Sequence, residues 1–593
     1  MLRNIAIILL AAAVIALPFA LRREAETSGW RAGDPVVVIV SPHNEAIRHE
    51  FGRAFAAWHE AHYGRPAKVD WRTIGGTTQI MRYLASEYVA SFRAWWTRRG
   101  RPWPEGGGDL LLDYRFRPDR VPPELARDPA AMQRWEIQRD MRAAFHGTDD
   151  AAEFGSGIDL FFGGGTYDHG KAQRQGLTVQ PWPPDDPPAG LLRTGEGVTL
   201  LPRSLGGERW RSDTFFGAAL STFGICYNHD RIRELGLDHP PRAWSDLTDP
   251  RYIGQVGVAD PTKSGSISKA FEMIVHEQCH DRVRAAGYGP QEVAACEAAI
   301  RSSPAGAGHV PEGVPAAYQA AVADGWRAGL RLVQRIGANA RYFTDSAGKV
   351  PIDVSTGDAA AGLAIDFYGR YQAETSRGPG GEQRMTYVTP VGGSSVSADP
   401  ISLLRGAVHR DTAIRFIRFV LSEEGQQLWN YAPGTPGGPH RFALRRLPVR
   451  RDFYPSDDPA IQAAHEKHPE HGVDALGDPS VNPYGLAQRF TYQPRWTARH
   501  FSIHRDLIRA MCLDAGDELR AAWTAIVRNG GPERQPVAMA LLERLPDRPE
   551  PLTWASALTV GKRYERLDYM REWTLFFRES YREAECAARG ELP

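Results

Sequence analysis

The sequence lacks the features that mark several large functional classes. Its 71 Lys and Arg side chains are balanced by 71 Asp and Glu, so it lacks the basic excess that nucleic-acid binding usually requires. It contains no Walker A run, and the G-x-S-x-G pattern of a nucleophile elbow occurs only in part, at Gly155 to Gly157. Catalysis, nucleic-acid binding and a bound cofactor are therefore not expected.

Cysteine is also scarce, with five in 593 residues. None forms a CxxC pair, and their spacing fits no zinc site. Cys279 with Cys296, and Cys512 with Cys586, are the plausible disulfide pairs if the chain is exported. Free buried thiols are the open alternative.

Long apolar runs are absent except at the N-terminus. Residues 5–21 are almost entirely apolar and lie between Arg3 and the pair Arg22-Arg23. This pattern predicts an export signal over residues 1–33, and its length also suits a retained membrane anchor. No later segment is apolar and long enough to span a bilayer, so we expect the rest of the chain to work in the periplasm.

What is present is an alternation of strands and helices after residue 34. A buried strand is predicted at 35–41; it ends at Ser41 and is followed by His43, Asn44 and a helix. A second strand is predicted at 67–74 and is followed by Thr77, Thr78 and another helix. Such order implies a parallel α/β sheet, whose ligands bind at the carboxyl ends of the strands. The polar residues above occupy those ends.

A third strand, at 158–162, ends in Gly163-Gly164-Gly165. Glycines allow the backbone to approach a ligand or another chain closely, although a plain tight turn is an equal alternative. Residues 91–150 interrupt the pattern and are interpreted as an insertion. Gly164 and Gly165 are therefore candidate ligand contacts.

The most informative stretch is 241–277. It contains an amphipathic segment, predicted to be helical, then a buried strand at 253–259 and a polar loop that opens a second helix. Thr262, Ser264, Gly265 and Ser266 lie in that loop, where free backbone N–H groups suit an anionic or oxygen-rich ligand. Ordinary capping of a structural helix is the alternative.

The run W-S-D-L-T-D-P-R-Y-I-G-Q-V, followed by D-P-T-x-S-G-S, resembles the extracellular solute-binding proteins of ABC transporters, in the ferric-ion-binding-like branch. The resemblance implies a two-lobed type II periplasmic-binding-protein fold of α/β class, with a helical C-terminal extension. It implies a first lobe over 34–223, a second over 224–388 with an insertion near 281–325, and a return to the first lobe over 389–455. It also implies that 224–228 and 387–390 are the strands that cross between the lobes, and that 411–429 is the closing amphipathic helix. Residues 456–593 lie outside the resemblance and are expected to be a helical cap on the lobes, with a partner-binding module as the alternative.

Iron-binding members of this branch use a His after the first strand, an acidic residue and two adjacent tyrosines. His43 falls at the His position, no carboxylate falls within 163–166, and the tyrosine pair aligns with Phe367 and Tyr368. Because an acidic ligand and one phenol are missing, direct ferric binding is not expected, and no metal site is predicted. Tyr368 is instead expected to stack on, or hydrogen-bond to, an organic ligand.

One further motif is consistent with a different function. His276-Glu277-Gln278-Cys279-His280 fits H-E-x-x-H, which on a helix can hold zinc with the glutamate as general base, and Glu297 is the nearest third ligand. A solvated helix face is the alternative. The exported-hydrolase hypothesis depends on this motif.

The predicted function is that of a periplasmic solute-binding component of an ABC importer, whose partners are a small molecule and an inner-membrane permease. An anionic or amphoteric organic solute should bind in a cleft between the lobes, because helix N-termini favour oxyanions and Asp366 would hold a cationic group. An iron-related ligand is the other solute that the resemblance allows. A membrane-anchored ligand sensor on the same fold is the alternative. The predicted site residues are Ser41, His43, Asn44, Thr77, Thr78, Gly164, Gly165, Thr262, Ser264, Gly265, Ser266, Asp366 and Tyr368.

Overall fold

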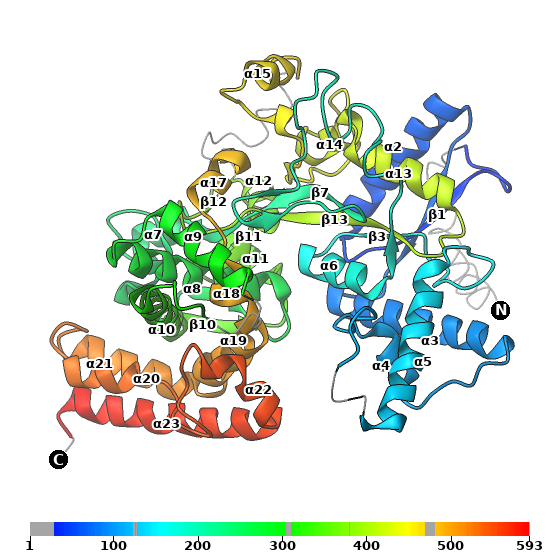
Figure 1. Cartoon of the computed structure of the whole chain (residues 1–593). Helices are drawn as coiled ribbons and strands as arrows, with labels where there is room; N and C mark the ends of the chain where they lie inside the picture. The colour runs from blue at the N-terminus through cyan, green and yellow to red at the C-terminus, as the bar shows by residue number, and fades with distance from the viewer. Residues whose placement is uncertain are drawn as a thin grey trace, which may run out of the picture. The chain divides into compact units, whose positions relative to one another are not determined.

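The computed structural model describes residues 29–591, apart from 123, 124, 126, 304–309, 379 and 469–480. The described chain divides into two compact units (Figure 1). Unit 1 takes the chain up to Pro188, together with Asp213–Phe215 and Ile401–Gly425. Unit 2 takes Ala189–Ser212, Phe216–Pro400 and the chain from Gln426 onward. The export signal predicted over 1–33 lies almost entirely outside the described residues.

Unit 1 is built on a parallel core of three strands, β1 (Val36–Val40), β2 (Lys68–Arg72) and β3 (Leu160–Phe162). Strand β1 pairs in parallel with β2 on one side and with β3 on the other. Its five β-branched residues suit a strand buried on both faces. Helices α2 (Glu45–Tyr63), α3 (Thr77–Arg98) and α6 (Thr166–Gln175) follow the three strands in turn. The parallel α/β class predicted from the sequence is confirmed.

The predicted insertion folds as two helices, α4 (Gly107–Leu112) and α5 (Pro129–Gly147). Met141 and Phe145 of α5 are buried in one cluster with Phe92, Trp95 and other residues of α3. The insertion thereby covers the long helix that begins at the candidate site of unit 1.

The sheet of β1 to β3 continues through strands that return from later in the chain. Its order is β14-β7-β13-β3-β1-β2, where β7 is Phe215–Ser221, β13 is Ser397–Leu404 and β14 is Leu447–Pro448. The short β4 (Thr178–Val179) also pairs with β13. Strand β13 is antiparallel to β3, with Ile401 opposite Phe162.

Unit 2 contains a second sheet of the same design, in the order β10-β9-β11-β8-β12. Its strands are β8 (Phe223–Asn228), β9 (Val256–Ala259), β10 (Ala340–Thr344), β11 (Ala361–Ile365) and β12 (Met385–Val388). Strand β9 is parallel to β10 and β11, whereas β8 is antiparallel to β11 and β12. In both sheets, three parallel strands are therefore followed by an antiparallel strand from elsewhere in the chain. This strand order is that of the type II periplasmic-binding-protein fold.

The second sheet is covered by α8 (Gly265–Ala285) and α10 (Ala316–Ala338), which pack closely against each other. A Cβ atom on Gly325 would lie 2.3 Å from the Cα of Cys279, and one on Gly329 would lie 2.4 Å from the Cα of Val275. Only glycine fits at these two positions, because the obstacle is the backbone of α8.

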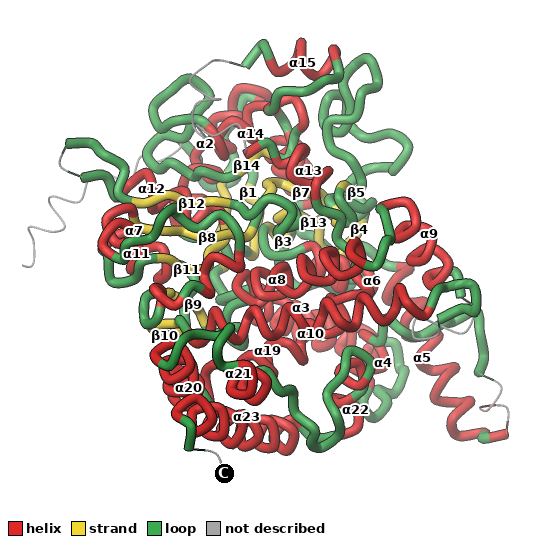
Figure 2. Tube along the Cα trace, turned by 90° about the vertical axis from the view of Figure 1, so that its left-hand side faces the viewer, coloured by secondary structure: helices red, strands yellow, loops and turns green. Residues whose placement is uncertain are grey.

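The C-terminal extension is helical, as the sequence predicted. It contains α15 (Pro459–His465), α17 (Pro483–Arg489), α18 (Pro494–Thr497), α19 (Phe501–Ile508), a π-helical turn (Arg509–Asp514), α20 (Gly516–Arg528), α21 (Pro536–Leu542), α22 (Val560–Arg563) and α23 (Arg566–Arg589). Helices α20, α21 and α23 lie side by side in both views (Figures 1 and 2).

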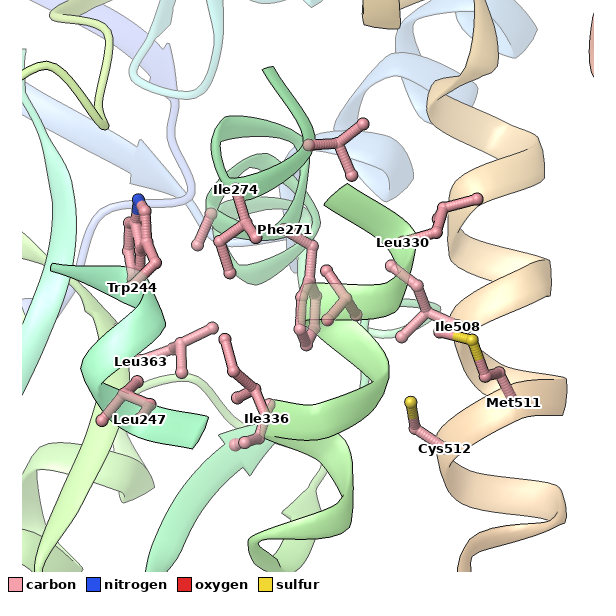
Figure 3. Packing of buried hydrophobic residues seen from close by; sticks show 14 of the residues in the cluster. Trp244, Leu247, Phe271, Ile274, Leu330, Ile336, Leu363, Ile508, Met511 and Cys512 are labelled. Carbon is pink, nitrogen blue, oxygen red and sulfur yellow. The ribbon is translucent and has the colours of Figure 1, made fainter. Parts of the chain in front are cut away.

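This extension shares a hydrophobic core with the second sheet. Ile508, Met511 and Cys512 belong to the same buried cluster as Leu330 and Ile336 of α10, and face them in Figure 3. Gly337 provides the room, since a Cβ there would lie 2.6 Å from the Sγ atom of Cys512. The extension is therefore part of the folded core of unit 2.

The remaining helices and strands are short or peripheral: β5 (Ser204–Leu205), β6 (Glu208–Arg209), α7 (His229–Glu234), α9 (Pro290–Arg301), α11 (Lys349–Thr356), α12 (Asp366–Thr375), α13 (Arg410–Leu421) and α14 (Glu423–Asn430). No helix within 29–591, the masked positions aside, is long and apolar enough to cross a membrane. The five cysteines are free thiols, so the structure has neither disulfide that the sequence allowed.

Three local predictions were wrong. The amphipathic segment after Pro241 forms two 3₁₀ turns, Trp244–Thr248 and Pro250–Tyr252, because Pro250 starts a new turn and fixes its backbone. The closing helix is interrupted at Ser422, whose extended backbone separates α13 from α14. The sequence predicts a strand at 363–368, but β11 ends at Ile365 and Asp366 already belongs to α12.

Candidate ligand site

The predicted residues of unit 1 gather at one edge of its sheet. Because β1, β2 and β3 are parallel, their carboxyl ends meet at the same edge, and each runs into the N-terminus of a helix. Those three helices begin at Glu45, Thr77 and Thr166. Backbone N–H groups in the first turn of a helix have no acceptor within the helix, so this edge presents three sets of donors.

The turn after β1 is fixed by two of the predicted side chains. The Oγ atom of Ser41, which is buried, accepts a hydrogen bond of 3.1 Å from the backbone N–H of His43. The side chain of Asn44 caps α2 by accepting from the N–H of Ile47 at 3.1 Å. Ser41 and Asn44 thus shape the loop that carries His43.

The glycine run is where the three loops meet. Gly163 and Gly164 both have φ of 102°, in the left-handed region that favours glycine. A Cβ on Gly163 would lie 2.7 Å from Nε2 of His43, and one on Gly164 would lie 2.7 Å from Cγ2 of Thr77. The glycine backbone therefore passes directly against two predicted side chains, which a bare glycine pattern could not reveal.

The start of α3 is the most open of the three helix ends. Thr77 is half-buried and Thr78 is exposed. Gly76 lacks a side chain to cap the helix, and its own N–H donates to Oε1 of Gln79 at 2.6 Å. The first-turn N–H groups beside Thr77 are consequently available for an external acceptor.

Sequence reasoning missed two residues at this edge. Tyr167 and Asp168 occupy the first turn of α6, directly after the glycine run, and the Tyr167 side chain is 71% exposed. Burial raises the pKa of Asp168 to about 6, while nearby Lys171 acts in the opposite direction. Their position in the strand–loop–helix pattern is the same as that of Thr77 and Thr78, and this was the signal that could have identified them.

In unit 2 the loop after β9 occupies the corresponding place. Ser264 caps α8, with its Oγ atom accepting from the N–H of Ile267 at 3.3 Å and lying 3.2 Å from Oγ of Ser266. Oδ1 of Asp260 accepts from both the N–H and the hydroxyl of Thr262, at 2.7 and 2.6 Å. Gly265 is exposed and Ser266 is half-buried. Gly265 and Ser266 are thus the open part of this loop, while the Thr262 hydroxyl is bonded within it.

Asp366 and Tyr368 lie in the first turn of α12. The Asp366 carboxylate is fully buried and accepts from the N–H of Thr222 at 3.0 Å and from the N–H of Phe367 at 2.8 Å. Burial raises its pKa, whereas Arg370 and Arg446 act in the opposite direction. Asp366 therefore joins α12 to the start of β8, and its bonds leave it little capacity to hold a ligand's cation. Tyr368 is half-buried, with its ring 4.2 Å from that of Phe367.

The H-E-x-x-H motif has a different use from the one that its sequence allowed. Nδ1 of His276 lies 3.0 Å from Oγ1 of Thr497, and its Nε2 accepts from the N–H of Gln493 at 3.1 Å. Nε2 of His280 lies 2.8 Å from the carbonyl oxygen of Thr491, to which it donates. Burial lowers the pKa of His280 to about 4. Burial also lowers the pKa of His276 well below its ordinary value, so both rings are neutral at pH 7. His276 is bonded to the extension through both ring nitrogens and His280 through Nε2.

The third ligand considered for zinc is also occupied. Glu297 is buried, and its carboxylate accepts two hydrogen bonds from Arg495, of 2.6 and 3.0 Å. Tyr318 and Trp496 donate to the same carboxylate. Across the part of the chain that the structure describes, no group of three or more His, Cys, Asp or Glu residues is arranged to hold a metal ion.

A buried charged cluster lies beside that motif on α8. Nζ of Lys269 lies 3.2 Å from Glu208 and 3.1 Å from Glu272, and 3.7 Å from the ring centroid of Tyr492. Thr497 donates to Glu272 at 2.8 Å. Helix α8, which starts after the loop that follows β9, is thus joined to the extension by a hydrogen bond to Glu272 and by the contact of Lys269 with the Tyr492 ring, as well as by apolar packing.

Residues 200–292 match the family described as bacterial extracellular solute-binding protein. This segment contains β8, β9, the loop after β9 and α8. The resemblance predicted from the sequence is confirmed by this match, which includes the motif that carried it.

A curated relative is known only as an uncharacterized protein of Haemophilus influenzae. It is 24% identical over 209 residues, which are 35% of this chain and 45% of the relative. The chain thus matches less than half of that relative's length.

Solved structures with a similar course of chain are periplasmic binding proteins. One is AfuA of Actinobacillus pleuropneumoniae, with fructose-6-phosphate bound, at 14% identity and a TM-score of 0.40 over 77% of this chain and 97% of that one. Iron-bound HitA of Pseudomonas aeruginosa has 14% identity and a TM-score of 0.41, over 81% and 100%. The spermidine/putrescine-binding protein PotD of Streptococcus pneumoniae has 13% identity and a TM-score of 0.41, over 80% and 100%.

Proposed function

We propose that this chain, part of which matches the bacterial extracellular solute-binding family, binds a small anionic or amphoteric organic solute outside the inner membrane. It then delivers the solute to the permease of an ABC importer. The observation that carries this proposal is the same in both units. A polar or glycine-rich loop follows a parallel strand and opens a helix, and the N–H groups of the first helical residues have no carbonyl one turn earlier in the helix to bond to.

The direction of these helices favours an oxyanion. A helix N-terminus carries a partial positive charge that contributes typically about 0.3–1 kcal/mol to a nearby negative group, and up to ~2 kcal/mol when partly buried. In unit 1 the donors of α3 and the glycine backbone beside His43 and Thr77 offer such a site. In unit 2 Gly265 and Ser266 do the same. Neutral sugars gain little from this arrangement, so we rank phosphates, phosphonates and carboxylates above them.

The exposed ring of Tyr167 favours a ligand with an organic part. Its ring is 71% exposed at the start of α6, next to the glycine run. An exposed aromatic ring stacks on the face of a sugar or other planar group, while its hydroxyl remains available for a hydrogen bond. Asp168, whose pKa is raised to about 6, is protonated in mildly acidic solution and then adds no repulsion toward an anion.

A thermal-shift screen tests the proposal. The panel contains inorganic phosphate, glucose 6-phosphate and citrate, together with glucose and spermidine as a neutral and a cationic probe. A compound that binds only the folded state stabilises it by about 2.7 kcal/mol at roughly one hundred times its dissociation constant. We expect at least one oxyanion to raise the melting temperature, and Thr77→Val and Ser266→Ala each to remove that shift without unfolding the protein.

Thr97→Val in α3 and Thr375→Val in α12 are matched controls, because both are exposed threonines whose hydroxyls bond only to their own helix. They should leave the shift unchanged. If glucose or spermidine shifts the melting temperature while no oxyanion changes it, the proposed anion site is refuted.

Location tests the transport part of the proposal separately. We expect the full chain to be found in the periplasmic fraction or on the outer face of the inner membrane, and intact-mass analysis to show whether the segment at 1–33 has been removed. A cytoplasmic protein that retains Met1 would contradict the importer.

A further inference from the structure

We propose that Arg505 and Arg509, two arginines of the C-terminal extension, are positioning residues for the ligand loop of unit 2, defined as residues 260–264. The inference rests on the proposed function, because it assigns these arginines to the loop that opens α8. Neither arginine is required to contact the solute. Their role is to hold the loop in the conformation that presents Gly265 and Ser266.

Arg505 holds the backbone of the loop from the extension. Its Nε donates to the carbonyl oxygen of Pro261 at 2.7 Å, and its Nη2 donates to the carbonyl oxygen of Thr262. The planar guanidinium is suited to two acceptors that point the same way, because its donors form a fixed fork. The two successive carbonyls are thereby held in a common direction.

Arg509, one turn further along, holds the side chains of the loop. Its Nη1 lies 3.4 Å from Oδ2 of Asp260 and 3.3 Å from Oγ1 of Thr262. The other carboxylate oxygen of Asp260 closes the turn by accepting from Thr262. Arg509 therefore neutralises the carboxylate that organises the loop and would otherwise repel an anion there.

The support for these arginines is itself well fixed. Nε1 of Trp326 donates to Nε2 of His504 at 2.6 Å, which ties α19 to α10. On the other side, Asp506 accepts from Arg566 at 2.6 Å and from Tyr569 at 2.7 Å, which ties α19 to α23. A side chain on such a base can fix the loop geometry more tightly than one on a mobile segment.

Further hydrogen bonds join the loop to the rest of unit 2: the N–H of Asp260 donates to the carbonyl oxygen of Thr344 at 2.8 Å, and the hydroxyl of Ser268 donates to the carbonyl oxygen of Pro261 at 2.6 Å. Lys263 and Asp345 form a pair of 2.6 Å between exposed side chains, and such pairs contribute little to stability. Within the loop, the N–H groups of Lys263 and Ser264 bond to the carbonyl oxygen of Asp260. Loss of the arginines should therefore loosen these internal bonds without unfolding the extension, since the apolar contacts of Ile508, Met511 and Cys512 remain.

Hydrogen–deuterium exchange of the unliganded full chain tests the inference directly. The variants are Arg505→Gln, Arg509→Gln and the double variant. Arg582→Gln is the matched control, because Arg582 pairs at 2.9 Å with Glu518 inside the extension. We expect amide exchange in the peptide spanning residues 260–267 to accelerate at least tenfold in the double variant. The control should exchange like the wild type, and peptides from α20 and α23 should be unchanged in all variants.

Binding of inorganic phosphate and glucose 6-phosphate supplies the functional readout. The double variant should bind the better of these probes about tenfold more weakly, and Arg505→Lys should not restore the affinity, because the lysine ammonium lacks the planar fork that holds both carbonyls in one direction. Restoration by Arg505→Lys, or loop exchange unchanged from the wild type, would overturn the inference. If the wild type binds no oxyanion, the proposed function fails, while the exchange measurement still decides whether the arginines position the loop. Should the Gln variants unfold, exchange in the conservative Arg505→Lys protein takes their place, with unchanged loop exchange again overturning the inference.

Discussion

At the scale of residues, hydrogen bonds to the extension account for the two histidines of the motif on α8. His276 and His280 are neutral, and each is bonded to the extension. Lys269 lies two turns before His276, between two carboxylates that are nearly excluded from solvent. The two histidines serve folding here, because their hydrogen-bond partners lie more than two hundred residues later in the chain.

Lys269→Met should destabilise unit 2 strongly. The substitution leaves Glu208 and Glu272 buried without their cation, and breaking a buried pair from one side typically costs about 3–5 kcal/mol. Urea denaturation measures the loss in the free energy of unfolding. Lys263→Met is the control, because Lys263 pairs with Asp345 at the exposed surface, where such a pair is worth about 1 kcal/mol or less. Equal losses in the two variants would contradict the argument.

Asp168→Asn should make unit 1 more stable at neutral pH. Burial raises the folded-state pKa of Asp168 to about 6, so the folded state binds a proton more tightly than the unfolded chain does. The stability of the wild type therefore falls as the pH rises from about 4 to about 6, and above this range the carboxylate remains a cost.

The variant removes that cost. It should gain roughly 1–2 kcal/mol at pH 7, since each pKa unit corresponds to about 1.4 kcal/mol and the side chain is partly solvated, and nothing at pH 4. Thermal melts at the two pH values make the comparison, with Asn in place of the exposed Asp185 as the control. A gain that is the same at both pH values would show that the raised pKa is not its cause.

At the scale of elements, strands and helices with a strong period were predictable from the sequence. The three strands of unit 1 and the helices that follow the first two strands lie where the pattern placed them, whereas α6, after the third strand, was not predicted. The ends of elements were not predictable where the backbone conformation changes at a single residue, as at Ser422 and at the end of β11 at Ile365. The periods of apolar residues continue across such points, so only the folded backbone reveals the break.

The close packing of α8 and α10 is also an element-scale property. Gly329→Ala would place a Cβ atom 2.4 Å from the Cα of Val275, which forces the two helices apart. Overpacking of this kind costs about 1–3 kcal/mol, although alanine is otherwise the better helix former. Gly170→Ala in α6 is the control, because its nearest neighbour is the end of the flexible Arg174 side chain at 3.5 Å. Chemical denaturation should show a loss for Gly329→Ala and none for the control.

At the scale of the whole molecule, the candidate site was only partly predictable. Sequence order placed His43, Thr77 and the Gly163–Gly165 run at strand ends, and the structure shows them in contact within unit 1. The sequence could not show that the Asp366 carboxylate accepts from the backbone N–H of Thr222, or that Arg505 donates to a carbonyl of the loop after β9. Such contacts depend on how distant segments pack, which a linear pattern does not record.

A chain that stops at Pro455, where the resemblance ends, should not yield a folded unit 2. The truncation removes about two-fifths of the buried members of its hydrophobic cluster, including Trp496, Leu507, Met511 and Trp573, and exposes the face of α10 that they cover. We expect the truncated protein to elute as aggregates on size exclusion and to lose its near-ultraviolet circular dichroism. A soluble monomer that keeps the wild-type spectrum would show that the extension is an independent cap.

The single cluster that joins the second sheet to the extension has a consequence for biosynthesis. Its members run from Phe223 to Ala588, so it cannot close until nearly the last residue has been made. A chain still leaving the ribosome therefore holds at most an unfinished unit 2. The loop at residues 260–264, which Arg505 of the extension contacts, takes its final form only after the extension has been made.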